Sequence, residues 1–312
     1  MKILFTGGSS FTGYWFIREL AAAGHEVTAI FRNKAEDYSD AVRRRRVKLA
    51  SDLSRPVHGC SFGDAAFLTL IKEGGWDLVC HHAADVTNYK SPSFDATGAA
   101  SKNTHNLLEV TEALKSIGCG KVVLTGSVFE GGEGAGSQGL PDFSPYGLSK
   151  TITAQVFRFY CDRAGMSLGK FVIPNPFGPF EEPRFTGYLM KNWVAGNPAS
   201  CSSPSYVRDN IHVSLLAKAY AKFVGSLPAT PGFTKLNPSG YPESQGAFTL
   251  RVAQEVRPRL QKPCVVELQK QTDFPEPRVR INTDVLDADA LGWNESAAWN
   301  DFAAYYEELC GK

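Results

Sequence analysis

The sequence predicts an α/β protein in which helices cover both faces of a doubly wound parallel sheet. In the first two-thirds of the 312-residue chain, short apolar runs alternate with amphipathic helical stretches, which is the pattern that such a sheet produces. The chain also begins with an apolar run that leads directly into a glycine-containing turn and a helical pattern. A strand, a glycine turn and a helix in this order are typical of the first unit of a doubly wound sheet.

The predicted strands are rich in apolar and β-branched residues and do not alternate cleanly, as expected for strands covered on both faces. They span Lys2–Thr6, Glu26–Phe31, Leu78–His81, Val122–Thr125 and Lys170–Ile173. Helical periodicity lies between them over Tyr14–Ala23, Ala65–Glu73 and Ala99–Ser116. His81 falls within an apolar strand, so we interpret it as a packed, hydrogen-bonded residue and not as a catalyst.

Composition changes after Ile173, and this change predicts a second, smaller lobe. Residues 174–205 are rich in Pro, Phe, Asn and Ser, and further loop-rich stretches precede a last helical pattern that ends near Cys310. We therefore assign residues 1–173 to the sheet domain and residues 174–312 mainly to a C-terminal substrate-binding lobe. Segments near 206–238 are expected to return to the sheet domain. Because ligands of open α/β sheets bind at the carboxyl ends of the strands, this lobe would close over the site.

The charge balance argues against nucleic-acid and membrane partners. The chain has 33 basic and 32 acidic side chains, so it has no global field that would recruit a polyanion. Basic residues do cluster at Arg43–Lys48. We interpret this cluster as a solvated face, which could extend a positive rim near a bound cofactor.

Cysteine usage and hydropathy predict a cytoplasmic protein. The seven cysteines are scattered and form no Cys-x-x-Cys pair, which argues against a zinc site and a disulfide framework. No metal site is predicted. No segment has the roughly 20 apolar residues of a membrane span, and the N-terminal run is not of signal-peptide length.

The turn after the first strand predicts a Rossmann-type dinucleotide site. Glycine supplies the backbone angles of a tight turn, a small residue allows the pyrophosphate to approach, and the helix N-terminus supplies free amides. Gly7 and Gly13 have the spacing of a Gly-x-x-Gly-x-x-Gly turn, with Ser10 at the middle position. The predicted cofactor-binding residues here are Gly7, Ser9, Ser10, Phe11, Thr12 and Gly13.

The end of the second strand favours NADP over NAD. An NAD site usually has a carboxylate there to bind the ribose hydroxyls, whereas a 2′-phosphate needs a cation. In this chain the strand continues into Arg32 and Lys34 without an acidic residue. Arg32 can bind the phosphate through its planar fork, and Lys34 can add positive charge. NAD remains the alternative.

Tyr146 and Lys150 are the predicted acid–base pair. They are four residues apart, so in a helix they lie one turn apart on the same face. A nearby cation lowers the pKa of a phenol, and the lysine can also hold the nicotinamide ribose. Ser127 follows the fourth predicted strand, where its hydroxyl can bind a substrate oxygen. These three residues are a constellation for carbonyl or alcohol chemistry, with Tyr146 and Lys150 also touching the cofactor.

The chain resembles the extended short-chain dehydrogenase/reductase family, in its NAD-dependent epimerase/dehydratase branch. The resemblance rests on several motifs in family order: Thr6–Gly13, Val79–Ala84, Ser127, Tyr146–Lys150, Pro174–Pro179, Arg208–Val213 and Leu291–Trp293. It implies that Ala83, Ala84, Pro174 and Phe177 line the cofactor. It also implies that Asn175 faces the substrate and that Arg208 and Arg280 hold the diphosphate of a nucleotide sugar. Members of the family are commonly homodimers formed through two helices beside the sheet.

One departure from the family narrows the predicted chemistry. Val128 and Phe129 follow Ser127, where the sugar 4,6-dehydratases resemble one another in carrying Asp-Glu. We therefore predict an NADP-dependent reductase of a nucleotide-activated 4-keto sugar. The main alternative is an NAD(P)-dependent nucleotide-sugar 4-epimerase that uses the same residues. A reductase of a non-sugar carbonyl compound is a third reading, and a non-catalytic cofactor sensor is disfavoured because Ser127, Tyr146 and Lys150 are all retained.

Overall fold

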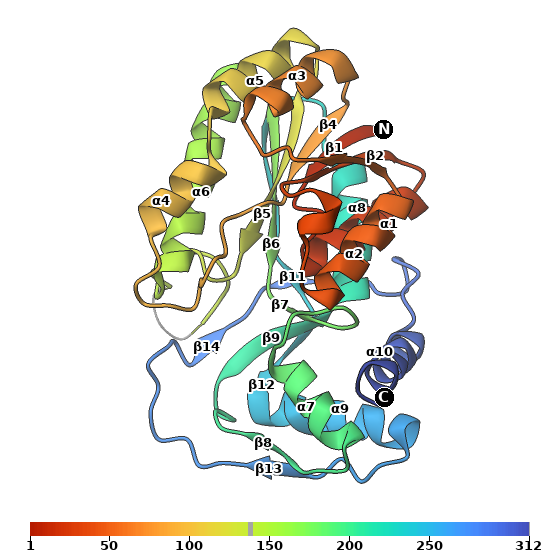
Figure 1. Ribbon diagram of the computed structural model, residues 1–312. Helices are drawn as coiled ribbons and strands as arrows, with labels where there is room; N and C mark the ends of the chain where they lie inside the picture. The colour runs from red at the N-terminus through yellow and green to blue at the C-terminus, as the bar shows by residue number, and fades with distance from the viewer. Residues whose placement is uncertain (137–139, 312) are drawn as a thin grey trace.

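A computed structural model describes residues 1–136 and 140–311 and has a seven-stranded parallel sheet at its centre (Figure 1). The strand order is β10-β6-β5-β4-β1-β2-β3, so the chain winds outward in both directions from β1 and β4. The strands are β1 (Lys2–Thr6), β2 (Glu26–Phe31), β3 (Arg55–His58), β4 (Leu78–His81), β5 (Lys121–Ser127), β6 (Ser167–Ile173) and β10 (Gly232–Leu236). The predicted α/β fold with a doubly wound sheet is confirmed.

Helices cover both faces of this sheet and bury its apolar side chains in two separate cores. One face packs against α1 (Phe11–Ala22), α2 (Ala41–Asp52) and α8 (Val213–Ser226). The other face packs against α3 (Ala65–Gly74), α5 (Leu107–Ser116) and α6 (Pro145–Ala164), and α4 (Ala96–Asn103) lies against α6. Figure 1 shows the two groups of helices on opposite sides of the strands. A short 3-10 turn, η1 (Ala35–Asp37), precedes α2.

A smaller lobe lies beyond the carboxyl ends of the strands (Figure 1). Its main sheet pairs β9 (Val207–His212) with β7 (Asn175–Phe177), β12 (Tyr241–Ser244) and β14 (Val279–Arg280). Its helices α7 (Phe185–Val194), α9 (Gln245–Leu260) and α10 (Glu295–Cys310) enclose an aromatic core around Trp299 and Phe302. Two short pairs complete it: β8 (Ala199–Cys201) with β13 (Val266–Leu268), and β11 (Pro238–Ser239) with β15 (Asp284–Val285).

The segment near residues 206–238 is divided between the two parts of the molecule. Helix α8 packs against α1, and β10 pairs in parallel with β6 at the edge of the large sheet. Strand β9 instead belongs to the sheet of the smaller lobe. The chain therefore crosses between the two parts several times after Ile173.

Three local predictions need correction. The helix expected over Ala99–Ser116 is two helices, because the backbone of Asn106 has a φ of +50°, which interrupts the helix. The Asn106 side chain donates to the Gly63 carbonyl. Strand β3 was not predicted, because Pro56 and its polar neighbours give it no apolar run. The basic cluster is not only a solvated face, because Arg46 of α2 is 2% exposed. Within the glycine-rich loop after β5, residues 137–139 lie outside the described residues.

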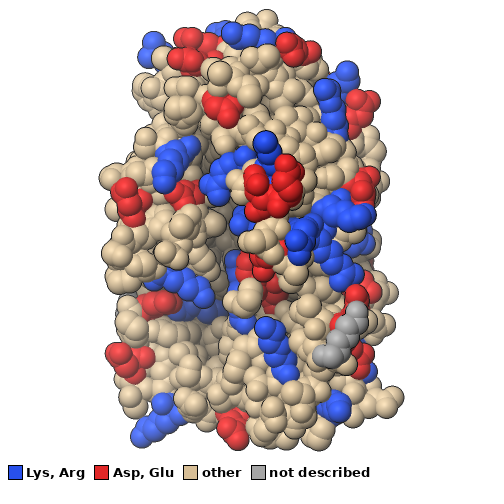
Figure 2. All heavy atoms as spheres, viewed as in Figure 1, with Lys and Arg blue, Asp and Glu red and all other residues tan. Residues whose placement is uncertain are grey.

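The described residues also show how surface charge, apolar helices and cysteines are distributed. Figure 2 shows basic and acidic side chains interspersed over one face of the molecule. In the described ranges, none of the helices combines the length and the apolar character that a membrane crossing requires. The seven cysteines, all within those ranges, are free thiols. Among the same residues, no three His, Cys, Asp or Glu side chains gather into a metal-binding group.

Candidate active site

The turn between β1 and α1 is built for close approach of the backbone. Gly7 has a φ of +86°, and a Cβ atom there would lie 2.8 Å from the Ala83 nitrogen, just after β4. A Cβ atom on Gly13 would collide with the Gly7 carbonyl. The two glycines therefore allow the β1 turn, the segment after β4 and the first turn of α1 to pack together. The free amides of that helical turn, with its positive dipole end, fit the pyrophosphate of a dinucleotide.

Ser10, which occupies the middle position of the turn in place of glycine, is hydrogen-bonded to His82. Ser10 caps α1: its Oγ accepts from the Gly13 amide at 3.0 Å and donates to the Gly7 carbonyl at 2.9 Å. The Nε2 atom of His82 lies 3.0 Å from Ser10 Oγ and 3.1 Å from Thr12 Oγ1, and its Nδ1 lies 2.9 Å from Thr125 Oγ1 of β5. Sequence reasoning missed this histidine, because only the fold brings the three strand ends together.

The imidazole of His82 is neutral in the folded protein. Burial lowers its pKa to about 3, and the Lys150 ammonium acts in the same direction. Its neighbours Phe5 and Phe16 pack against the ring. The adjacent His81 is buried against Phe62 and Phe157, and its Nδ1 lies 3.1 Å from Thr6 Oγ1, as the sequence analysis expected of a packed residue.

Basic residues from the end of β2 and from α2 lie near the turn. Arg32 and Lys34 are exposed just after β2. From α2, Arg43 Nη2 lies 3.4 Å from Ser9 Oγ, and its Nε is buried with no hydrogen-bond partner among the described residues. Arg46 donates to the Ser9 carbonyl at 3.2 Å and to the Phe180 carbonyl at 2.8 Å, which ties the turn to the smaller lobe. Arg43 thus joins the predicted cofactor residues.

Ser127, Tyr146 and Lys150 meet at the carboxyl end of β5. Ser127 ends β5 and is buried, and its Oγ accepts from the Phe129 amide at 3.2 Å. Tyr146 lies in the first turn of α6, where Ser144 caps the helix and Pro145 occupies its first position. Lys150 is buried one turn later and donates to the Thr125 carbonyl at 2.7 Å. The structure therefore brings the three predicted catalytic residues to one place.

The phenol of Tyr146 is protonated at neutral pH in this structure. Burial raises its pKa well above the ordinary value, and the Glu130 carboxylate and the Tyr89 phenol add to this effect. Arg184 and a hydrogen bond with Ser127 act in the opposite direction. We expected Lys150 to lower this pKa, but the net direction is upward because desolvation dominates. Burial also lowers the pKa of Lys150.

Aromatic rings form a wall around the phenol. The rings of Tyr89 and Phe94 lie 5.2 Å and 6.2 Å from that of Tyr146, and Phe129 lies 6.4 Å away. Sequence reasoning noted Phe129 only as a replacement for an acidic residue and did not single out Tyr89 or Phe94, because both lie outside any motif. Such a wall excludes water from the hydroxyl and offers an apolar face to a substrate ring.

The two arginines expected on the substrate side, Arg208 and Arg280, form hydrogen bonds with the protein itself. Arg208 donates to the carbonyls of Val207, Pro277 and Arg278 and pairs with Glu276 at 2.9 Å. Arg280 is 1% exposed, and its guanidinium donates to three backbone carbonyls of the segment after β5. Both guanidinium groups are therefore engaged by the protein itself.

The remaining predicted residues lie along two segments that border the site. Ala83 and Ala84 follow β4, and the Ala83 amide donates to Thr6 Oγ1 at 3.1 Å. Pro174 joins β6 to β7, and Asn175 begins β7 opposite Asn210 of β9. Phe177 packs into the core of the smaller lobe, so its contribution to a cofactor site is limited to its backbone.

The structure combines a doubly wound α/β fold with a group formed by Ser127, Tyr146 and Lys150, the predicted acid–base residues. The family model described as "NAD dependent epimerase/dehydratase family" matches residues 3–231. The chain belongs to this family, within the extended short-chain dehydrogenases/reductases. A search of curated proteins found no match.

Solved structures that resemble this one are nucleotide-sugar 4-epimerases. UDP-glucuronic acid 4-epimerase from Bacillus cereus, in complex with a fluorinated substrate analogue and NAD, has a TM-score of 0.77 and 18% identity over 99% of this chain and 100% of that one. UDP-glucose 4-epimerase from Thermotoga maritima, with UDP-glucose, has a TM-score of 0.71 and 17% identity over 99% of each chain. UDP-glucose 4-epimerase from Bifidobacterium longum, with NAD+ and UDP, has a TM-score of 0.69 and 19% identity over 99% of this chain and 98% of that one. At these identities the likeness establishes the fold.

The neutral state of His82 predicts a pH dependence of stability. The pKa of this residue lies below the ordinary value of 6.5 when folded, so the unfolded chain binds a proton between pH 6.5 and about 3 that the folded chain excludes. Stability therefore falls as pH decreases through this window, by up to ~1.4 kcal/mol per pH unit for one proton. In His82→Gln the free energy of unfolding should depend less steeply on pH, by up to ~1.4 kcal/mol per pH unit, which is the contribution of one proton. Urea unfolding from pH 7 to pH 4 measures this difference. An unchanged slope would contradict the assignment. Some slope should remain, because burial also lowers the pKa of His81 and His212 to about 3.

Proposed function

We propose that this chain is a 4-epimerase of a nucleotide sugar, which inverts a hydroxyl-bearing carbon of the sugar by transient oxidation to a keto group and re-reduction, with Tyr146 as the acid–base. The observation that carries the proposal is the meeting of Ser127 and Tyr146 at the end of β5, with Lys150 buried one helical turn away. Membership of the epimerase/dehydratase family supports it. The substrates named for the 4-epimerase structures of the same fold support a UDP-sugar as the first substrate to test.

The residues present fit a nicotinamide dinucleotide. Gly7, Gly13 and Ser10 shape the turn that would hold its pyrophosphate, and Ala83 lies against that turn. When bound, this cofactor would supply the acceptor and donor of hydride. For the oxidation step Tyr146 must first lose its own proton to solvent, which nearby positive charge would favour. As the phenolate it would then take the proton of the substrate hydroxyl, and it would return that proton during reduction. Ser127 would hold the same oxygen, and the Lys150 ammonium would favour the phenolate while the proton is away.

Dehydration is disfavoured by the residues that follow Ser127. Val128 is apolar and buried, and Phe129 belongs to the aromatic wall. The nearest carboxylate in sequence, Glu130, is 1% exposed and accepts from the Ser127 amide at 2.7 Å. Its two oxygens are engaged by the Ser127 amide and the Lys170 ammonium, so it is not free to act as the acid that elimination of water requires.

A second candidate is the reduction of a keto sugar with NADPH as a consumed co-substrate. The observation that favours it is that Arg32 and Lys34 follow β2 without an acidic residue at its tip, and that Arg43 of α2 reaches Ser9 of the turn. A 2′-phosphate would be held there by charge-assisted hydrogen bonds. The two candidates use the same catalytic residues and differ in whether the cofactor is consumed.

The first test is direct. Purified protein with NAD+ or NADP+ should interconvert the C4 epimers of UDP-glucose or UDP-glucuronic acid, resolved by anion-exchange chromatography, with no net change in absorbance at 340 nm. Tyr146→Phe should lower kcat roughly 100- to 10,000-fold, because it removes the group that transfers the proton. Tyr188→Phe, an exposed tyrosine on α7, is the matched control and should retain full activity.

The outcomes separate the two candidates. Stoichiometric NADPH consumption with a nucleotide-4-keto sugar, without epimer interconversion, would replace the epimerase proposal by the reductase. Absence of both activities over a panel of UDP- and other nucleotide sugars would overturn the substrate class. Full activity of Tyr146→Phe would remove Tyr146 from the chemistry.

Arg43 should decide the preference for NADP. Loss of a charge-assisted hydrogen bond to the 2′-phosphate costs about 1.5–3 kcal/mol, so Arg43→Ala should weaken NADPH binding about tenfold or more. The Kd of NADH should change little, because NADH has no 2′-phosphate. Both are measured by cofactor fluorescence, with the exposed neighbour Arg44→Ala as control. Equal weakening of NADH and NADPH would show that Arg43 acts through the shape of the turn alone.

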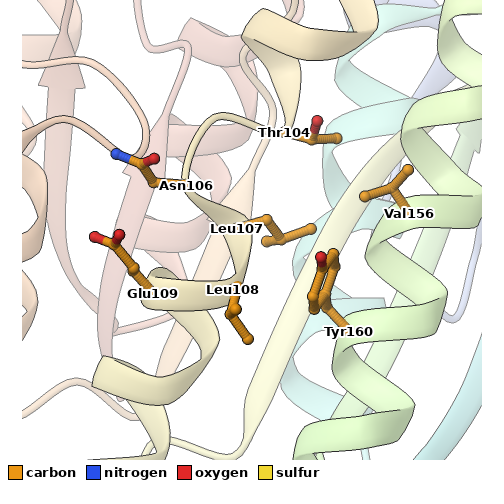
Figure 3. A pocket seen from close by; sticks show the side chains of 7 residues that line it. All are labelled: Thr104, Asn106, Leu107, Leu108, Glu109, Val156 and Tyr160. Atoms are coloured by element: carbon orange, nitrogen blue, oxygen red, sulfur yellow. The ribbon is translucent and has the colours of Figure 1, made fainter.

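We further propose a homodimer formed through α5 and α6. A shallow pocket of about 300 Å3 lies between these helices and is lined by Leu107, Leu108, Val156 and Tyr160, among others (Figure 3). Leu108 is 41% exposed at this surface. A second copy of the chain would cover the apolar side chains that this face presents to solvent.

The dimer is tested by charge insertion at this surface. Leu108→Arg should shift the mass measured by light scattering after gel filtration from dimer to monomer, because it would bury an unpaired charge in the interface. Leu250→Arg places the same charge on an exposed leucine of α9 and should leave the mass unchanged. A monomeric wild-type protein, or a dimeric Leu108→Arg variant, would contradict this interface.

A further inference from the structure

The turn that follows the catalytic serine is held by a buried carboxylate. Glu130 Oε1 accepts from the Ser127 amide at 2.7 Å, and its Oε2 pairs with the Lys170 ammonium of β6. Both side chains are buried, at 1% and 7% exposure. The carboxylate thus reaches back past Val128 and Phe129 to hold the backbone of the residue that would hold the substrate oxygen.

A second carboxylate completes the ion cluster without touching Ser127. Glu133 accepts from Lys170 at 2.8 Å, from Lys235 at 2.9 Å and from Asn237 Nδ2 at 2.9 Å. Removing charges from water costs several kcal/mol per ion unless pairing compensates, so a buried cluster of this kind is an expensive way to stabilise a fold. Within this cluster only Glu130 bonds the Ser127 amide, so Glu130 is the member that can fix the geometry of this turn.

Arg280 holds the same turn from the smaller lobe. Its guanidinium donates to the carbonyls of Val128, Glu130 and Pro141, and it packs 4.8 Å from the centre of the Phe143 ring. Next to it, Ile281 pairs with Ala135 through an isolated β-bridge. A diphosphate bound by Arg280 would displace these carbonyls, and each buried carbonyl left unpaired costs about 1–3 kcal/mol.

We propose that Glu130 is a positioning residue that fixes Ser127 at the active site, and that Arg280 fastens the same turn instead of binding the diphosphate of the substrate. The proposal rests on the proposed function in so far as Ser127 binds the reacting oxygen. Its geometric part, the fastening of residues 127–136, does not depend on the identity of the substrate. The diphosphate of a nucleotide sugar would then be held by groups other than Arg280.

The test uses the full chain with bound cofactor and three variants. Glu130→Gln removes the charge that holds the Ser127 amide and pairs with Lys170. Arg280→Lys keeps the positive charge but removes the planar fork that reaches three carbonyls. Glu133→Gln is the matched control, since it removes a buried carboxylate from the same ion cluster without a bond to Ser127. Hydrogen–deuterium exchange of the 127–132 backbone is measured first, because it needs no substrate.

The expected results differ between the variants and the control. Glu130→Gln and Arg280→Lys should exchange faster at 127–132 than wild type and lower kcat roughly tenfold to a hundredfold, with the substrate KM within about twofold. Glu133→Gln should leave both kcat and exchange at Ser127 and Phe129 near wild type. Inhibition by UDP should be unchanged in Arg280→Lys.

A pH profile separates positioning from simple loss of stability. The groups that face Tyr146 are Glu130 and Tyr89, which raise its pKa, and Arg184, which lowers it. Removing the charge of Glu130 should therefore move the pH dependence of turnover toward lower pH in Glu130→Gln, and Glu133→Gln should not move it. Thermal unfolding of all variants shows whether they fold.

Several outcomes would overturn the proposal. One is a raised KM and weaker UDP inhibition in Arg280→Lys with unchanged kcat and exchange, which would assign the diphosphate to Arg280. Another is equal behaviour of Glu130→Gln and Glu133→Gln in exchange, kcat and pH profile. If Arg280→Lys does not fold, the comparison of the two glutamate variants decides. If the wild-type protein turns over no nucleotide sugar, the proposed function is wrong. If hydrogen–deuterium exchange at 127–132 is unchanged in Glu130→Gln, the positioning proposal is wrong, whatever the substrate.

Discussion

The site depends on a neutral, partly buried imidazole that joins three strand ends. His82, just after β4, binds Ser10 and Thr12 of the β1 turn on one side and Thr125 of β5 on the other. Because parallel strands end at the same edge of the sheet, one side chain can reach both the cofactor turn and the strand that carries Ser127. The low pKa of this imidazole keeps it uncharged, so the contact needs no counter-ion and leaves the charges of the site to Lys150 and Glu130.

The charged groups around Ser127 lie on different sides of it. Lys150 faces the Thr125 carbonyl within the site, whereas Glu130 and Lys170 lie behind the serine and Arg280 closes the turn from the smaller lobe. A protonated Tyr146 in an aromatic wall is suited to give a proton, and it needs a nearby cation to become a base. Fold, acid–base chemistry and interlobe contact therefore meet in one short segment, 127–136.

Much of the fold could be predicted from the sequence because its signals are local. Apolar runs marked five of the seven central strands, and Gly7 with Gly13 marked the turn after β1. Two strands were not predicted: β3 because Pro56 interrupts its pattern, and β10 because its partly exposed sequence Gly-Phe-Thr-Lys-Leu has no apolar run. The break in the helix at Asn106 was also not predicted, because it involves a hydrogen bond to the carbonyl of Gly63, which lies in another segment.

The sequence by itself determined the family, the dinucleotide turn and the candidate triad of Ser127, Tyr146 and Lys150, because each is encoded by residue types at short spacings. Only the tertiary structure decided what surrounds them. It brought His82 to Ser10 and Arg43 to Ser9, placed Glu130 behind Ser127, and engaged Arg280 with the turn after β5. These contacts join residues far apart in the chain, and whether a given arginine or histidine is solvated, paired or catalytic depends on such neighbours, which no local pattern specifies.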